Sequence, residues 1–261
     1  MKEFSFLSTN DLSLIPKLDV MKNIGIKAEL TDYSIVLGGR IYEEKDNKKI
    51  GGYWLKGKCL FDGESDALLG NYLDKEKNNS RFIGIRPCIK FEYLNDIKIN
   101  EKQVEIKENN GFLECEYGIY PQNVVTKELN EILENAYKRG ILEESKNSYT
   151  IFNDKKEECK EYKCGKRSFL RIKCEFNDYK TEVKLSNGEI YKKGDIVWIE
   201  IKPIKWWIDI KSKKMFTDKI IYAGCEYSKT NLHHNNENFE NSKINEFMNK
   251  YLSKEILQIN R

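Results

Sequence analysis

The chain has 261 residues, of which 39% are hydrophobic and 33% are charged, which is enough apolar material for one large domain or two smaller ones. Its 45 basic and 42 acidic residues nearly cancel to a net charge of +3, which argues against a dedicated nucleic-acid surface, because such surfaces carry a marked basic excess. With 12% aromatic residues and only four prolines, the composition is not that of a disordered chain.

The N-terminal sequence "MKEFSFLSTNDLSLIPKLDV" has neither an uninterrupted apolar stretch nor a small-residue cleavage site, so we expect no signal peptide. No window approaches the roughly 18 apolar residues that a membrane span needs. Seven cysteines, an odd number, are then expected to be reduced thiols. These observations favour a cytoplasmic protein. The Lys-, Asn- and Ile-rich composition is typical of AT-rich bacterial or phage genomes, so we expect a bacterial cell or a phage-infected host.

In the first third of the chain, the β-branched run "YSIVL" at 33–37 predicts a buried strand before two glycines. The segment "RFIGIRPCIKFEYL" predicts a pair of strands interrupted at Arg86 and Pro87, because proline cannot donate to a strand ladder. Residues 95–111 are polar and predict a connection between an N-terminal segment, 1–94, and a C-terminal segment, 112–261. The two segments could equally form one composite domain.

The clearest helix is "TKELNEILENAYKRG", which Thr126 can cap and Gly140 can end. Helical spacing places several apolar side chains on one of its faces. These are Leu129, Ile132, Leu133, Ala136 and Tyr137.

Beyond a predicted charged loop at 153–166, the chain becomes rich in strands. In "FLRIKCEF", apolar residues at 170, 172, 174 and 176 alternate with charged ones, and in "IVWIEIK" Val197, Ile199 and Ile201 share one face. Asn187 with Gly188 predicts a hairpin turn, and 193–195 a second turn. An amphipathic helix closes the chain, capped at Ser242 and with an apolar stripe. The stripe consists of Ile244, Phe247, Met248, Tyr251 and Leu252. The predicted class is α+β, with mainly antiparallel strands and a few helices.

The motifs of common catalytic and metal sites are missing from the sequence. Cys159, Cys164 and Cys174 lack the second ligand pair of a structural zinc site, and the adjacent His233 and His234 lie in an Asn-rich stretch without a nucleophile motif. We therefore predict no catalytic residue, no metal site and no cofactor.

Several segments together resemble a set of bacterial and phage proteins that are related to the C-type-lectin-like fold of formylglycine-generating enzymes. The matching segments are "YGIYPQ", "KPIKWWIDI", "DKIIYAGCEY", "NSKINEFMN", "GYWLKG" and "IGIRPCIKF". The resemblance implies a scaffold that is C-type-lectin-like in part. The elements that close the family's domain stand here at 51–91, before its opening elements, so either one domain is permuted or two partial domains pack together. The copper-site cysteines of formylglycine-generating enzymes and the sugar-binding triplets of lectins have no match here, so neither chemistry is implied.

The stretch "KPIKWWIDI" raises the question of whether its tryptophans bind a ligand or fill a core. Strand alternation sends one ring to each face, so we expect one in the core and the other on a surface. The residues predicted to bind a partner are Trp206, Trp207, Lys205, Arg86, Tyr53 and Trp54.

The first functional hypothesis is a non-enzymatic protein-interaction module whose loops contact another protein, with inhibition of a host defence system as a concrete version if a phage encodes the chain. Its interaction loops are expected at 41–50, 74–81, 153–166 and 228–241. A second hypothesis is an enzyme with a reactive thiol such as Cys59 or Cys88. A third is a nucleic-acid binder that uses Lys202, Lys205, the tryptophans and the "KSKK" turn.

Overall fold

The computed structural model describes residues 30–37, 54–55, 58–59, 84–85, 87–99, 102–109, 112–151, 157–175, 182–211, 213–223 and 246–256. The helices are α2 (Asp32–Val36), α3 (Lys127–Lys138) and α5 (Ser253–Ile256), with a 3₁₀ turn η4 (Leu94–Asp96) and a π-helical turn η6 (Met248–Leu252). The strands are β1 (Trp54–Leu55), β2 (Lys58–Cys59), β3 (Gly84–Ile85), β4 (Cys88–Lys90), β5 (Lys98–Ile99), β6 (Lys102–Gln103), β7 (Ile106–Asn109), β8 (Phe112–Val124), β9 (Glu143–Ile151), β10 (Glu157–Cys164), β11 (Arg167–Lys173), β12 (Glu182–Lys184), β13 (Ile190–Lys192), β14 (Ile196–Asp209), β15 (Lys214–Thr217) and β16 (Tyr222–Ala223). The predicted predominance of antiparallel strands with few helices is confirmed for this part of the chain.

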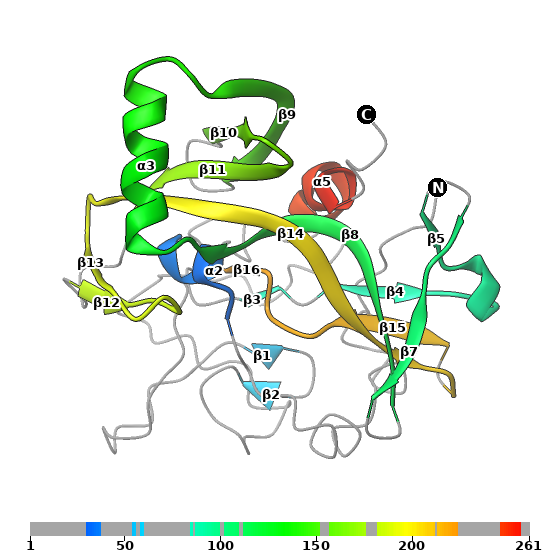
Figure 1. Ribbon diagram of the computed structural model, residues 1–261. Coiled ribbons are helices and arrows are strands. Elements are labelled where there is room, and N and C mark those ends of the chain that lie inside the picture. The colour runs from blue at the N-terminus through cyan, green and yellow to red at the C-terminus, as the bar shows by residue number, and fades with distance from the viewer. Residues whose placement is uncertain are drawn as a thin grey trace.

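The main sheet is built around the long strand β14 (Figure 1). Along one edge β14 pairs with β8, which continues to β7. Along its other edge β14 pairs first with β11 and then with β15, so the sheet forks into a β11–β10–β9 branch and a β15–β4 branch. All of these strand pairs are antiparallel. Because β8, β11 and β15 each pair with β14, this strand links every part of the sheet.

Strand β14 has apolar side chains on one face and a mixed set on the other. Val197, Ile199 and Ile201 share the inner face, as predicted, and belong to the main hydrophobic cluster. The register shifts at Glu200/Ile201 and Pro203/Lys205. Beyond these bulges the inner positions are Ile204, Trp206 and Ile208, so the alternation of β14 shifts by one residue between Ile201 and Ile204. The outer face then carries Trp198, Glu200, Lys202, Lys205 and Trp207.

Helix α3 covers the outer face where β14 begins. Thr126 caps it by accepting a hydrogen bond from the Leu129 amide, and Gly140 follows its end with a positive φ, both as predicted. Leu133 is fully buried in a small cluster with Val125, Phe169 and Trp198. The predicted apolar stripe is only partly correct, since Ile132 is 60% exposed.

The predicted strand at 33–37 is wrong, because this segment forms helix α2. Thr31 caps the helix through the Ser34 amide, and the carboxylate of Asp32 accepts hydrogen bonds from the amides of Val124 and Ser186 at 2.9 and 3.0 Å. Tyr33 and Val36 are fully buried. A one-turn helix that is buried on most of its sides has the same continuous apolar sequence as a buried strand, so the two cannot be told apart by periodicity.

The predicted charged loop at 153–166 is also wrong, because residues 157–164 form β10 in the interior of its branch, between β9 and β11. Its charges fit a strand because most of its side chains stay exposed, while Glu161 is buried and accepts hydrogen bonds from Ser168 and Asn147. The predicted turns at Asn187–Gly188 and 193–195 are present, and they join β12 to β13 and β13 to β14. The strands at 84–90 are present and separate at Pro87, with β3 pairing β16 and β4 pairing β15.

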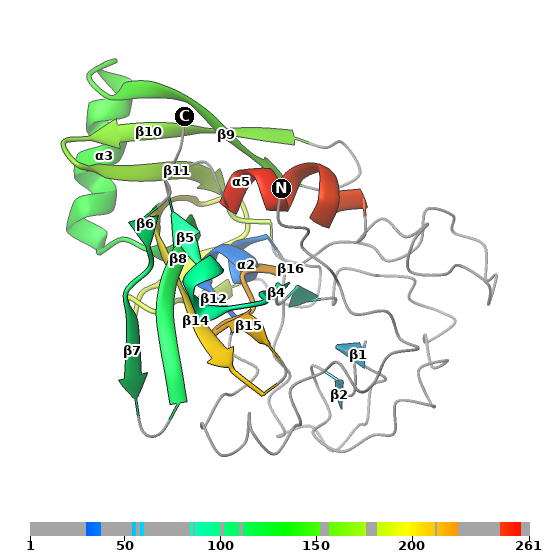
Figure 2. The ribbon, with the colours of Figure 1, turned by 90° about the vertical axis from the view of Figure 1, so that its right-hand side faces the viewer.

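The C-terminal segment is helical where the structure describes it, over residues 246–256 (Figure 2). Phe247, Met248 and Leu252 are buried, as the amphipathic pattern predicted, whereas Ser242 and Ile244 lie outside the described residues. The helix is interrupted by the π turn η6, which the pattern did not predict.

The polar stretch 95–111 contains most of η4, the β5–β6 hairpin and all of β7. Its Ile97 and Val104 belong to the same hydrophobic cluster as Ile89 from the N-terminal segment and Ile199 from the C-terminal one. Among the residues described, no helix combines the length and apolar character needed to cross a membrane.

Candidate functional site

Both tryptophans of the "KPIKWWIDI" stretch are buried. The indole N–H of Trp206 donates to the Tyr117 carbonyl at 2.6 Å on the inner face, and the ring is fully buried. The indole N–H of Trp207 donates to Asp218 Oδ1 at 2.6 Å on the outer face, and the residue is 6% exposed. The expectation that one ring stays exposed is therefore wrong, because the sheet is covered on both faces at this point.

Two neighbours cover Trp207. The Phe112 ring meets it edge-on, and Lys205 Nζ lies 4.4 Å from the ring centroid. A cation over an indole face is a stabilising contact, and here it also uses the ring surface that a base or another aromatic group would need.

Of the six residues predicted to bind a partner, only Lys205 has a described and partly exposed side chain. It forms a 2.7 Å ion pair with Glu114, with the two side chains 39% and 19% exposed. Burial alone would raise the pKa of Glu114, but hydrogen bonds from Lys205 and Asn109 outweigh it and lower the pKa. The remaining predicted positions, Arg86, Tyr53 and the side chain of Trp54, lie outside the described residues.

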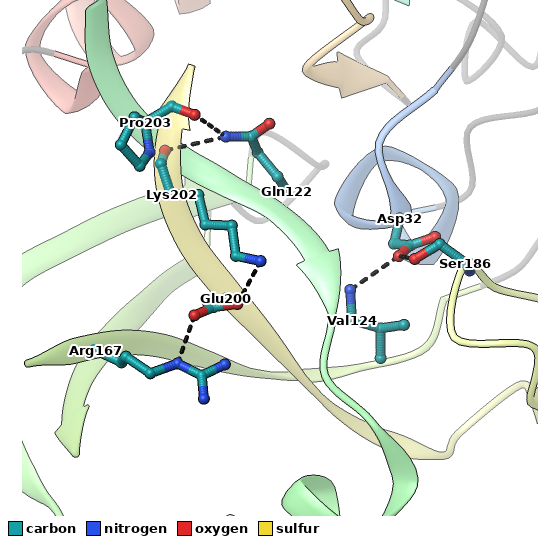
Figure 3. A network of polar contacts seen from close by, with 8 residues as sticks. All are labelled: Asp32, Gln122, Val124, Arg167, Ser186, Glu200, Lys202 and Pro203. Carbon is teal, nitrogen blue, oxygen red and sulfur yellow. Dashed lines mark hydrogen bonds and ion pairs between the residues drawn. The ribbon is translucent and has the colours of Figure 1, made fainter. Parts of the chain in front are cut away.

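A second ion cluster lies further along the outer face and was not predicted. Glu200 Oε1 accepts from Arg167 Nε at 2.6 Å, and its Oε2 lies 2.7 Å from Lys202 Nζ (Figure 3). The Arg167 and Lys202 side chains are 51% and 44% exposed, while that of Glu200 is only 12% exposed. Burial would raise the pKa of Glu200, but the two cations outweigh it and lower the pKa, so the carboxylate stays ionised near neutral pH.

The bulge that separates the two clusters is held by the "YPQ" segment of β8. The Gln122 amide donates to the Lys202 carbonyl at 3.0 Å and to the Pro203 carbonyl at 2.7 Å (Figure 3). Gln122 is the extra β8 residue at the first bulge, and its side chain thus anchors the backbone of β14 beside it. The Tyr120 hydroxyl points inward to Glu255, at 3.5 Å. The "YPQ" segment therefore contacts β14 on its outer side through Gln122 and the C-terminal helix on its inner side through Tyr120.

We define the charged face as the outer-face side chains of Glu114, Arg167, Glu200, Lys202 and Lys205. Its cations are about half exposed and its carboxylates are largely buried beneath them, so the surface that a partner meets is a row of positive charges. The carboxylates hold the cations in place, which lowers the entropy that the long side chains lose on binding. β14 and β8 supply a rigid backbone under the row.

The sequence contained part of the signal for this site. Glu200 and Lys202 stand at alternate positions of a predicted strand, which places them on one face. Arg167 and Glu114 come from other strands, and only the register of β11 and β8 on β14 brings them near. That register could not be derived from the sequence.

The thiol chemistry of the second hypothesis finds little support among the described residues. Burial raises the pKa of Cys115, Cys159 and Cys174 to about 12, whereas a reactive thiol needs a lowered pKa. Cys164 is exposed on β10. The side chains of Cys59 and Cys88, and both histidines, lie outside the described residues.

Within the described part of the chain, no group of three or more His, Cys, Asp or Glu side chains is arranged to hold a metal ion.

The described fold is a forked antiparallel sheet with few helices and a charged outer face. Comparison with protein-family models, with curated proteins and with solved structures gives no match.

Proposed function

We propose that this chain is a non-enzymatic protein-interaction module that binds its partner through the charged face. The observation that carries the proposal is the difference in exposure between the two members of each ion pair. The side chains of Arg167, Lys202 and Lys205 are about half exposed, whereas the carboxylates paired with them are largely buried. Surface ion pairs contribute only about 0–1 kcal/mol to folding, so stability alone gives little reason for such an arrangement. Fixed charges of this kind give a protein interface its orientation and its rate of association.

The partner expected for this surface is a protein that presents carboxylates with polar groups between them. Carboxylates of the partner would contact the exposed cations, which stay paired with Glu200 and Glu114. The polar groups between those carboxylates would lie against the two glutamates. We further propose that the forked sheet is a C-type-lectin-like scaffold, which the "YGIYPQ" and "KPIKWWIDI" segments support by resemblance.

The test is the binding of a partner from a bacterial lysate to the tagged chain, repeated with charge-reversed variants after nuclease treatment. Lys202→Glu with Lys205→Glu should weaken binding roughly 10- to 100-fold, because two attractive contacts become repulsive. The matched control is Lys146→Glu with Lys163→Glu, which reverses two exposed charges on β9 and β10 outside the charged face. Equal loss of the partner in both double variants would show that binding does not depend on the charged face.

One observation favours a second candidate, single-stranded nucleic acid. Tyr93 is 72% exposed, and Lys213 Nζ of the "KSKK" turn lies 5.7 Å from its ring centroid. An exposed ring beside a lysine is suited to base stacking. Binding that depends on Tyr93, falls steeply with added salt and survives the Lys202/Lys205 reversal would favour this candidate over the first.

A further inference from the structure

The C-terminal residues 246–256 cover the inner face of the sheet. Phe247, Met248, Leu252 and Ile256 are buried in the main hydrophobic cluster, on the face opposite α3 (Figure 2). The Phe247 and Tyr222 ring centroids are 4.3 Å apart. Apolar burial is therefore what holds this segment in place.

Strand β8 is shaped to receive the end of this segment. Gly118 has a φ of +69°, and a Cβ built on it would lie 2.4 Å from Ile256 Cγ2 and 2.7 Å from the Ile256 carbonyl oxygen. Only glycine permits both the conformation and the approach. The surface of β8 at Gly118 is thus complementary in shape to α5 at Ile256, and we call this the fitted contact.

At the centre of this contact lies the carboxyl group of Glu255, which is 4% exposed. Its Oε1 accepts from the Thr150 amide at 2.7 Å, and its Oε2 lies 3.5 Å from the Tyr120 hydroxyl. No salt bridge joins Glu255 to a cation among the described residues, and the charge that acts on it most strongly is the like charge of Glu158.

The groups that face this carboxyl from the surrounding elements are nearly all acidic or phenolic. They are Tyr120 of β8, Tyr149 of β9, Glu158 and Cys159 of β10, and Tyr33 of α2. On its own element, Lys254 is exposed. An ionised Glu255 would therefore be a buried charge without a counter-ion, which is costly.

Two further polar groups near this contact lack a hydrogen-bond partner among the described residues. The hydroxyl groups of Tyr33 and Tyr149 are buried and have no hydrogen-bond partner in the described structure. Their rings pack edge-on against Tyr120 on either side, with centroids 5.6 and 5.7 Å away. Buried polar groups without partners cost free energy. These two hydroxyl groups therefore offset part of the stabilisation that the apolar side chains of the segment provide. The π turn η6 adds a helical irregularity of a kind that often marks functional sites.

We propose that residues 246–256 form a detachable plug over a tyrosine-lined inner face, and that ionisation of Glu255 releases it. The apolar side chains seat the plug while the carboxyl is protonated. When the proton leaves, the buried charge favours the open state, in which Glu255 is hydrated and Tyr33, Tyr120, Tyr149 and Tyr222 are uncovered. The inference is independent of the charged face, which lies on the other side of the sheet.

Release is expected near neutral pH. Burial raises the pKa of Glu255 from 4.5 to about 7, mainly because the charged form loses its hydration. The docked state then binds the proton more tightly than the open state. The opening constant is therefore lowest below pH 4.5, rises between pH 4.5 and 7, and levels off above pH 7. For these two pKa values the opening constant increases roughly 70-fold between pH 5 and pH 8.

The test is amide hydrogen exchange of the full chain at pH 5 and pH 8, corrected for the intrinsic pH dependence of exchange. We expect protection of residues 246–256 and of the Thr150 amide to fall roughly 70-fold in the wild type and less than about threefold in Glu255→Gln. Glu157→Gln, which removes an exposed charge on the neighbouring strand, should behave as the wild type does.

Three results would overturn the proposal. Protection of residues 246–256 that does not change with pH would show that ionisation does not release them. The same fall in Glu255→Gln would assign the effect to another group. Protection of residues 246–256 equal to that of the β14 amides at both pH values, measured in the wild type alone, would show general unfolding rather than release of a plug, and this comparison holds even if the variant does not fold.

Discussion

The close approach of Gly118 to Ile256 leads to a prediction with an internal control. Gly118 and Gly140 have nearly the same φ, +69° and +67°, but a Cβ at Gly140 would meet nothing within 4 Å. The conformation alone costs an alanine about 1–2 kcal/mol at either position. At Gly118 the new Cβ must also displace the backbone of Ile256, which loses part of the burial that makes a core isoleucine worth about 2–5 kcal/mol.

We therefore expect Gly140→Ala to lower the free energy of unfolding by about 1–2 kcal/mol and Gly118→Ala by about 3–5 kcal/mol. Urea unfolding, with the slope compared between variants, measures both values. Adding Ile256→Ala should restore part of the loss at Gly118, because it removes the Cγ2 that lies 2.4 Å from the new Cβ. Equal losses at the two glycines would refute the fitted contact between β8 and the C-terminal segment.

Three other predictions follow from the buried groups. Trp206→Ala should cost about 3–5 kcal/mol of unfolding free energy, while Trp206→Phe, which loses the hydrogen bond but keeps one aromatic ring in the core, should cost less; equal costs would mean that the ring is not tightly packed. The folded pKa of Glu255 is raised above its unfolded value, so its stabilising effect is complete below pH 4.5 and lost as the pH rises through about 7. The unfolding free energy of the wild type should thus fall by about 3 kcal/mol relative to Glu255→Gln across this range, as denaturant melts at several pH values would show. Among the described thiols, Cys164 should react first with a thiol reagent in the native state, and early labelling of a buried one would contradict the structure. The buried ones are Cys115, Cys159 and Cys174.

The elements that could be predicted from the sequence are those whose signals are local. Helix α3 has a cap, an apolar period and a terminal glycine within fifteen residues, and the structure has the cap, the glycine and part of the apolar face. Strands β11 and β14 alternate clearly enough to place Ile172 and Ile199 inside.

The errors occur where distant residues decide the outcome. Helix α2 depends on Asp32 being bound by the amides of Val124 and Ser186, which are far away in the sequence. Trp207 is buried because Phe112 and Lys205 cover it, and Phe112 comes from a different strand. A residue's environment in a sheet depends on register, and register is a long-range property.

The charged face was missed for the same reason. Lys205 was predicted as a binding residue, but its neighbours were sought among aromatic side chains of the same stretch. The structure instead places it on Glu114 of β8, with Arg167, Glu200 and Lys202 forming a second cluster beyond the bulge (Figure 3).

Whether the charged face binds a protein can be decided by measuring partner retention in nuclease-treated lysate for three forms of the chain. These are the wild type, Lys202→Glu with Lys205→Glu, and Lys146→Glu with Lys163→Glu. We expect one stoichiometric protein that the wild type and the control retain and that the charged-face variant loses. A partner that all three forms retain equally, or recovery of nucleic acid alone before nuclease treatment, would contradict it.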